Sequence, residues 1–235
     1  LEGLPYLKFP KNSKEYKYLI ERRNKLGGFL PNREIFKTKL KFSDDHFREY
    51  DTETSREMST TMVFVKILTS MMRDKKIGQN IVPIVPDEAR TFGMDGLFRQ
   101  FGIYSREGQK YMPEDSDQVM WYRESEDGVM LEEGINEAGA MSAWIALATS
   151  YSSNKLPMIP FYIFYSMFGF QRVHDLAWAA GDARARGFLL GATSGRTTLN
   201  GEGLQHQDGH SHIFAQTIPN CKSYDPCFSY ELSTI

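Results

Sequence analysis

The amino-acid sequence predicts an α/β fold in which a mostly parallel sheet carries helices on both faces. Short apolar runs, typical of buried strands, alternate along the chain with longer segments of helical periodicity. The runs lie at residues 81–85, 158–164 and 188–190, and helical segments stand before and between them. Of the 235 residues, 41% are hydrophobic and 25% are charged, which is ordinary for a folded globular protein.

Residues 1–50 differ from the rest and are predicted to form a linker arm with one short charged helix. That helix has a start pattern at residues 12–15 and a stop at Gly27 and Gly28. An α/β domain is predicted over residues 51–235. The chain begins with leucine and ends in a helix-like pattern at 230–235, so we expect a piece of a longer protein whose domain is truncated at its C-terminal end.

Within the predicted domain, each element follows from a local pattern. A capping box at residues 54–57 predicts the start of a helix that continues to about Met72. The strand at 81–85 ends at Pro86. Residues 118–122 and 128–132 flank an Asp-Gly turn and are predicted to pair as a hairpin. Helices at 135–149 and 170–185 enclose the strand at 158–164, and the strand at 188–190 leads into a glycine-rich loop at 191–209.

Composition excludes several classes of protein. Lysine and arginine total 28 against 30 aspartate and glutamate, and this balance argues against a nucleic-acid-binding protein. The longest apolar stretch, at 156–170, is too short and too interrupted to span a membrane. With only two cysteines, Cys221 and Cys227, the chain cannot be a disulfide scaffold, and their spacing argues against a zinc knuckle. The low cysteine count fits a reducing, cytoplasmic location.

Polar clusters follow the predicted strands at 87–90, 133–137 and 165–172, where parallel sheets bind ligands. For Glu137, spacing alone favours a first-turn glutamate stabilised by the helix dipole over a partly buried carboxyl able to share a proton. In the glycine-rich loop, His206, His210 and His212 favour hydrogen bonding or proton transfer over metal binding, and a surface location stays open for at least one. The glycines at 195–203 lack the spacing of a phosphate-binding loop.

Four stretches together resemble one family. They are DEARTFG at 87–93, EGINEAG at 133–139, FYIFYSMFGFQR at 161–172 and TSGRTTLNGEGLQH at 193–206. The chain resembles the homodimeric bacterial pyruvate dehydrogenases, the thiamine-diphosphate-dependent decarboxylating components of the pyruvate dehydrogenase complex. It is similar to their middle region, the pyrimidine-type domain of the thiamine-diphosphate-binding fold, which receives the aminopyrimidine ring of the cofactor.

The resemblance implies roles for particular residues. Glu137 matches the glutamate that hydrogen-bonds the aminopyrimidine, and Phe168 matches the aromatic ring that stacks on it. Tyr165 and His206 match polar residues beside the group derived from the substrate. Asp87 and Glu88 match acidic residues on the rim of the active site.

The resemblance also implies an oxidoreductase that decarboxylates pyruvate, the product of glycolysis, and passes the acetyl group to the lipoyl-bearing acetyltransferase component of a multienzyme complex. Magnesium would be held by a Gly-Asp-Gly motif in a domain absent from this chain, since residues 181–183 read Gly-Asp-Ala inside a predicted helix. We therefore expect no metal site here, no membrane or nucleic-acid partner, and no activity from the chain alone.

Three alternatives remain at this stage. A transketolase-like transferase would share the sheet and the glutamate, but not the stretch at 165–172. A non-catalytic module could keep the fold without the chemistry. A metal hydrolase that uses the histidine loop is the most distant of the three.

Overall fold

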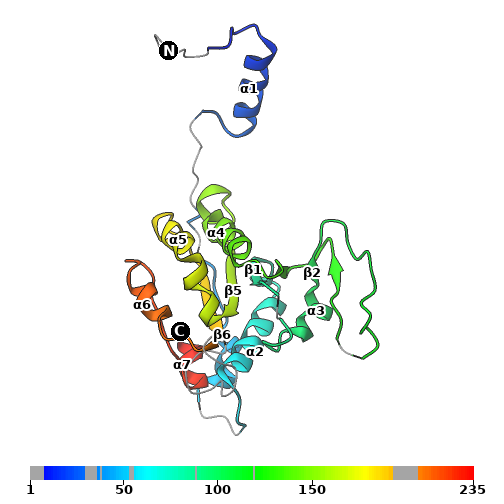
Figure 1. Cartoon of the computed structure of the whole chain (residues 1–235), viewed down its shortest axis with the longest axis vertical. Helices are drawn as coiled ribbons and strands as arrows, with labels where there is room; N and C mark the ends of the chain where they lie inside the picture. Colours follow the sequence, from blue (N-terminus) through cyan, green and yellow to red (C-terminus); the bar gives the residue numbers. More distant parts are fainter. Residues whose placement is uncertain are drawn as a thin grey trace.

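The computed structural model describes residues 8–29, 36–37, 39–52, 56–87, 89–118, 120–192 and 206–235 (Figure 1). The predictions for Glu88, for the first two residues of the capping box and for most of the glycine-rich loop lie outside these ranges. In the described part, no helix has the combination of length and apolar character that crossing a membrane requires.

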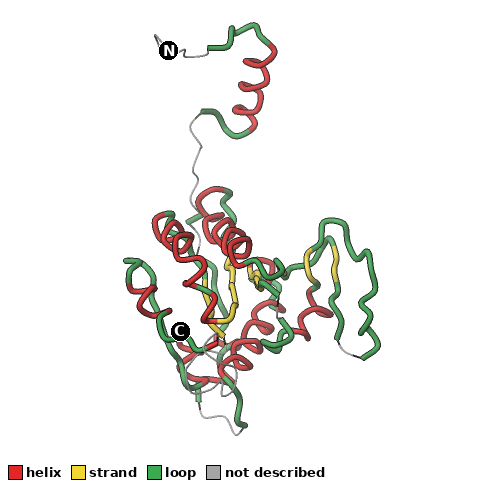
Figure 2. Tube along the Cα trace, in the orientation of Figure 1, coloured by secondary structure: helices red, strands yellow, loops and turns green. Residues whose placement is uncertain are grey.

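A parallel sheet of four strands forms the centre of the molecule (Figure 2). Its order is β4 (Leu131–Glu132), β1 (Ile81–Val85), β5 (Ile159–Tyr165) and β6 (Phe188–Ala192), and every neighbouring pair is parallel. All five residues of β1 are buried, which explains why its sequence is a continuous apolar run instead of an alternating one. The α/β prediction and its three apolar strands are confirmed.

Helices cover both faces of this sheet. On one face, α2 (Thr60–Arg73) and α3 (Asp95–Phe101) pack on side chains such as Ile81 and Phe161. On the other, α4 (Glu137–Ser153) and α5 (Phe170–Asp182) lie side by side and pack on Tyr162 and Phe164 (Figure 1). Because side chains alternate between the faces of a strand, β5 supplies both cores from consecutive residues.

The predicted hairpin is wrong. Strand β4 pairs with β1 in the main sheet, while β3 (Glu124–Ser125) pairs in parallel with β2 (Ile103–Tyr104). A Cβ on Gly128 would lie 2.3 Å from the carbonyl of Ile103, so this glycine permits a close approach of two backbones. Two residues later, Met130 is fully buried. Its burial holds the segment that leads into β4 against the main core.

Helix α2 begins later than the capping box predicts. Ser59 is its N-cap, and the Ser59 hydroxyl accepts a hydrogen bond from the backbone N–H of Met62 at 3.2 Å. Residues 57–59 are not helical. A serine nearer to the apolar stripe therefore supplies the cap, and it leaves Met58 outside the helix.

The N-terminal region holds the predicted short helix, α1 (Lys14–Lys25), capped by Ser13 and without a buried residue. It stands apart from the α/β body (Figure 1). The short 3-10 helices Asp44–His46 and Arg48–Tyr50, by contrast, pack against the α/β body. His46 lies 2.8 Å from the Ser70 hydroxyl and 3.1 Å from the Asp74 carboxylate, which anchors this segment to α2.

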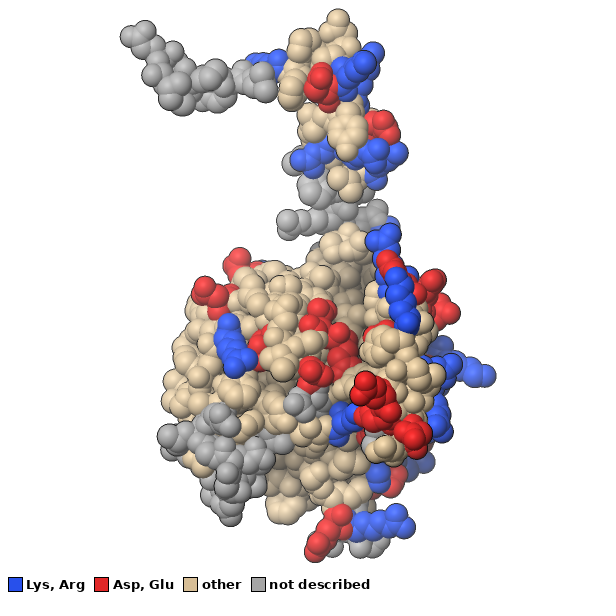
Figure 3. Space-filling view, turned by 45° about the vertical axis from the view of Figure 1, so that its right-hand side comes forward, with Lys and Arg blue, Asp and Glu red and all other residues tan. Residues whose placement is uncertain are grey.

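The C-terminal part adds two short helices, α6 (Ser211–Gln216) and α7 (Ser229–Thr234). Helix α7 packs against α2, and α6 against α5. Acidic and basic side chains are interspersed over the face shown in Figure 3, with several acidic ones gathered near the centre of the α/β body.

Candidate active site

The candidate site lies where the parallel strands end. Asp87 follows β1, the segment 133–137 follows β4, and the segment 165–172 follows β5. Because these strands are parallel neighbours, their carboxyl ends meet at one edge of the sheet. The three polar clusters predicted after the strands therefore lie at one edge.

Glu137 is the first residue of α4. Asn136 caps this helix, since its side-chain oxygen accepts a hydrogen bond from the Gly139 N–H at 3.0 Å. The Glu137 side chain is only 11% exposed, and its Oε1 accepts a hydrogen bond from Nη1 of Arg172 at 2.5 Å. The sequence predicted the position of this carboxylate but not its cationic partner, which comes from α5.

Aromatic rings gather beside this ion pair. The ring centroids of Tyr165 and His206 are 5.2 Å apart, and those of Phe168 and His206 are 5.6 Å apart, in both cases edge to face. Phe168 and Tyr165 meet edge to face at 6.3 Å. The Arg172 guanidinium lies over the Phe168 ring, 4.4 Å from its centroid. The structure thus brings the predicted residues Glu137, Tyr165, Phe168 and His206 to one place.

A tight connection between β5 and α5 positions this cluster. Residues Ser166–Phe168 form one 3-10 turn, Gly169 follows, and α5 begins at Phe170. A Cβ on Gly169 would lie 2.0 Å from the Phe164 ring, so only glycine allows the chain to turn this closely over the sheet. The turn places Phe168 and Arg172 on either side of the start of α5.

Tyr162, in the middle of β5, is fully buried and lies close enough to Glu137 and Arg172 to feel their charges. Its hydroxyl makes no hydrogen bond to any described residue. Burial raises the pKa of Tyr162, the nearby Glu137 carboxylate raises it further, and Arg172 acts in the opposite direction. A buried hydroxyl without a partner is costly in a folded protein, so one close to an ion pair marks a place for a polar ligand atom.

The rim of the site is only partly described. Asp87 is half-buried at the end of β1, whereas Glu88 lies outside the described residues. Close by, Arg90 donates to the backbone oxygen of Met120 and pairs with Asp115 at 3.2 Å. Asp87 thus stands at the carboxyl edge of the sheet, as the sequence predicts.

Sequence reasoning missed Glu132, the last residue of β4. Both of its carboxylate oxygens are buried. Burial raises the pKa of Glu132 to about 7; Asp87 adds to the rise, while Arg90 and a hydrogen bond from Tyr122 oppose it. The information that identifies Glu132 is the pairing of β4 with β1, which places Glu132 opposite Val85 at the end of a buried strand.

The raised pKa predicts that stability depends on pH. Between pH ~4.5 and ~7, folded Glu132 holds a proton that the unfolded chain releases, so the free energy of unfolding falls as pH rises through this window. The full shift corresponds to ~3 kcal/mol, and partial exposure to water reduces this to ~1–2 kcal/mol. In urea unfolding followed by fluorescence, Glu132→Gln should be more stable than wild type by this amount at pH 8 and similar at pH 4.5.

The exposed Glu126 supplies the control, because Glu126→Gln should keep the wild-type pH dependence. If Glu132→Gln instead runs parallel to wild type from pH 4.5 to 8, Glu132 does not hold this proton.

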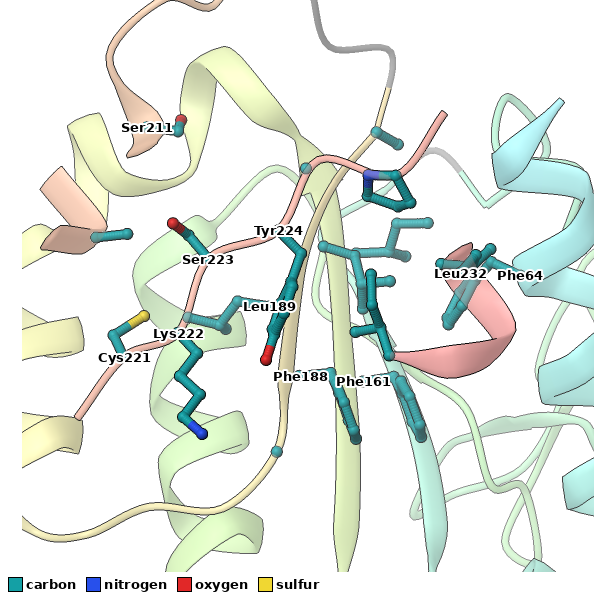
Figure 4. A pocket seen from close by; sticks show the side chains of 18 of the residues that line it. Phe64, Phe161, Phe188, Leu189, Ser211, Cys221, Lys222, Ser223, Tyr224 and Leu232 are labelled. Carbon is teal, nitrogen blue, oxygen red and sulfur yellow. The ribbon is translucent and has the colours of Figure 1, made fainter. Parts of the chain in front are cut away.

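A separate cavity of about 880 Å³ lies between β6, α2 and the C-terminal segment (Figure 4). Phe64, Phe161, Phe188, Tyr224 and Leu232 are among its mostly apolar lining. None of the predicted catalytic residues that the structure describes lines it, so this cavity is not the candidate active site. Among the described residues, no group of three histidine, cysteine, aspartate or glutamate side chains could hold a metal ion.

Comparisons with known proteins agree with this geometry. Residues 41–235 match the family described as pyruvate dehydrogenase E1 component middle domain. The whole chain is 61% identical to the pyruvate dehydrogenase E1 component of Pseudomonas aeruginosa, 60% to that of Escherichia coli K12 and 56% to that of Haemophilus influenzae. In each case the chain spans 27% of the length of the relative.

The family match covers most of the chain, including all the strands and the predicted site residues. This chain belongs to the family of pyruvate dehydrogenase E1 component middle domains.

Proposed function

We propose that this chain is part of a longer pyruvate dehydrogenase, a thiamine-diphosphate-dependent oxidoreductase. The longer protein would decarboxylate pyruvate and pass the acetyl group to a lipoyl carrier. The observation that supports this most directly is the convergence of Glu137, Phe168, Tyr165 and His206 at the carboxyl edge of the sheet. These are the residues to which the family resemblance gives roles.

The described residues fit the aminopyrimidine half of the cofactor. This ring is flat and carries N–H donors, so it needs an aromatic face and an acceptor. Phe168 offers the face and the largely buried Glu137 offers a carboxylate. The unpartnered Tyr162 hydroxyl supplies a further polar atom beneath them. When bound, thiamine diphosphate supplies an electron sink for the decarboxylation of a 2-oxo acid.

Each side chain then has a distinct task. Glu137 holds or releases a proton at Oε1, a task that suits a carboxyl shielded from water. Phe168 orients the flat ring by stacking. Tyr165 is fixed by Phe92, whose ring centroid is 5.3 Å away, and together with His206 it would hydrogen-bond the oxygens of the substrate. Asp87 and Glu88 form the acidic rim.

The remaining parts of the proposal rest on the family resemblance. Magnesium and the diphosphate would be bound by another domain of the longer protein. The active site would form between two subunits of a homodimer. The protein would work in the cytoplasm within a multienzyme complex, next to its lipoyl-bearing acetyltransferase.

The test is a kinetic assay of the longer protein with thiamine diphosphate, magnesium and a lipoyl acceptor. Wild type should consume pyruvate, and His206→Ala should lower turnover by ~100-fold or more while the cofactor Kd changes little. His174 serves as the control, because its Nε2 lies 3.0 Å from the Thr217 hydroxyl and resemblance gives it no role in the site. His174→Ala should keep the wild-type turnover and the wild-type cofactor Kd.

Other results would redirect the proposal. If ketose phosphates react and pyruvate does not, the protein is a transketolase-like transferase. If cofactor binds without turnover of either substrate class, the chain belongs to a non-catalytic module. If His206→Ala strongly weakens cofactor binding but keeps normal turnover at saturating cofactor, the role given to His206 is wrong.

A further inference from the structure

Strand β6 has the sequence of an inner strand but the surroundings of an edge strand. Its run, Phe-Leu-Leu-Gly-Ala, carries no polar side chain, which is typical of a parallel strand that is covered on both faces. Among the described strands β6 pairs only with β5, and both Phe188 and Gly191 on it are exposed. The sequence of β6 therefore indicates a further neighbour on its outer side.

The cavity of about 880 Å³ lies along this outer side and reaches both faces of the sheet (Figure 4). Phe64 on α2 and Phe161 line it from one face, and Ala177 and Ala180 on α5 line it from the other. A space between two helix layers, at the edge of a sheet, has the position of a strand. Its mostly apolar lining fits a strand whose side chains are buried on both faces.

The segment 221–226, which leads from α6 to α7, borders the cavity on the far side from β6. Figure 4 shows this segment running in the same direction as β6, with the Tyr224 side chain between them. Residues 222–226 make no backbone–backbone hydrogen bond to another described residue. Residues 189–191 of β6 have no strand partner on their outer edge in the described part of the chain. Two unpaired edges thus border one apolar cavity.

The handedness of the chain identifies the strand that belongs between these edges. Connections between parallel strands of one sheet are nearly always right-handed. The connection from β5 to β6 moves outward and crosses on the face covered by α5. Helix α7, which follows 221–226, packs against α2 on the opposite face. A right-handed connection on the opposite face must move in the opposite direction, so the strand after α7 lies between 221–226 and β6.

We propose that the cavity beside β6 is the seat of the segment that follows Ile235 in the longer protein, and that this segment enters it as a strand paired with β6 on one side and with 221–226 on the other. The inference rests on the proposed function only in taking the chain as part of a longer protein, in line with relatives of which it spans 27%. Because β6 leads toward the loop that carries His206, the added strand also supports that side of the candidate site.

The composition of this strand can be predicted. Since both of its faces are covered, we expect a continuous run of about five apolar residues, rich in valine, isoleucine and aromatic side chains. A helix of average length and a short connection place this run within about 30 residues beyond Ile235. The sequence of the longer protein checks this directly, and a polar or proline-rich stretch throughout those residues would contradict the proposal.

Hydrogen–deuterium exchange tests the pairing on two wild-type proteins, the isolated chain and the longer protein. Peptides that cover β6 and 221–226 should exchange about 10-fold or more slowly in the longer protein, because each gains a strand partner. The peptide that covers β5 is the matched control, since β1 and β6 already pair with it on both sides, and its exchange should change far less. Equal exchange of β6 in the two proteins would overturn the proposal.

A variant of the longer protein identifies the segment that fills the cavity. Leu190→Ser shortens an apolar side chain of the cavity lining, so exchange should become faster together at β6, at 221–226 and at one segment within about 30 residues beyond Ile235. Leu156→Ser is the control, because Leu156 is 54% exposed and does not line the cavity, and it should leave all three rates unchanged.

Two other results would show a different occupant and overturn the proposal. In one, the third segment that responds to Leu190→Ser lies in another part of the longer protein. In the other, the slow exchange of β6 is lost on dilution to monomers, which means that a second copy supplies the strand.

An assay of pyruvate turnover on the same longer protein separates this inference from the proposed function. Turnover without slower exchange at β6 removes the added strand and leaves the function standing. Slower exchange at β6 without turnover leaves the strand standing and removes the function.

Discussion

Glu137→Gln in the longer protein should lower turnover by ~100- to 10,000-fold, the usual range for a lost general acid–base group. Glutamine keeps the shape of the side chain at the start of α4 and can still hydrogen-bond, but it cannot transfer a proton. The loss should therefore appear in the turnover rate at saturating cofactor. The exposed Glu126→Gln should keep wild-type turnover and exclude a general effect of removing a carboxylate.

The decisive measurement for Glu137 is the rate of proton exchange on the thiazolium carbon of the bound cofactor. This rate reports cofactor activation separately from later steps. It should fall together with turnover in Glu137→Gln. An exchange rate close to that of wild type would remove Glu137 from this step of the mechanism.

The isolated chain should show no pyruvate dehydrogenase activity and should bind thiamine diphosphate no more tightly than ~1 mM, even with magnesium. The described residues offer one stacking ring, one carboxylate and a buried hydroxyl, and they offer no group of ligands for a metal. One stacked ring and one or two hydrogen bonds contribute only a few kcal/mol, which corresponds to millimolar affinity.

Calorimetry on the isolated chain checks this expectation, with the longer protein as the positive control. Heat of binding should be absent at micromolar cofactor for the chain and present for the longer protein. Tight, magnesium-dependent binding by the chain would show that it contains the diphosphate site, against the family resemblance.

The parts of the fold that were predicted correctly are those encoded locally. A run such as residues 81–85 is apolar because it is buried on both faces, and this is visible without knowing its neighbours. The hairpin failed because pairing is a long-range choice. Residues 131–132 pair with β1, 47 positions earlier in the chain, and not with the nearby segment, and the burial of Met130 favours this pairing.

In the candidate site, too, local features were predictable from the sequence and long-range contacts were not. The positions of Glu137, Tyr165, Phe168 and His206 after strand ends followed from their order in the sequence, and their roles came from the family resemblance. Their partners could not be predicted. Arg172 meets Glu137 across 35 residues of sequence, and such a contact depends on how α4 and α5 pack.

The outer strand β6 has a consequence for handling the protein. Among the described strands it pairs only with β5, and Phe188 on it is 42% exposed. A strand with one free side offers backbone donors and acceptors to any extended segment that approaches. Solubility of the isolated chain should therefore depend steeply on protein concentration, with light scattering rising as molecules join through this edge.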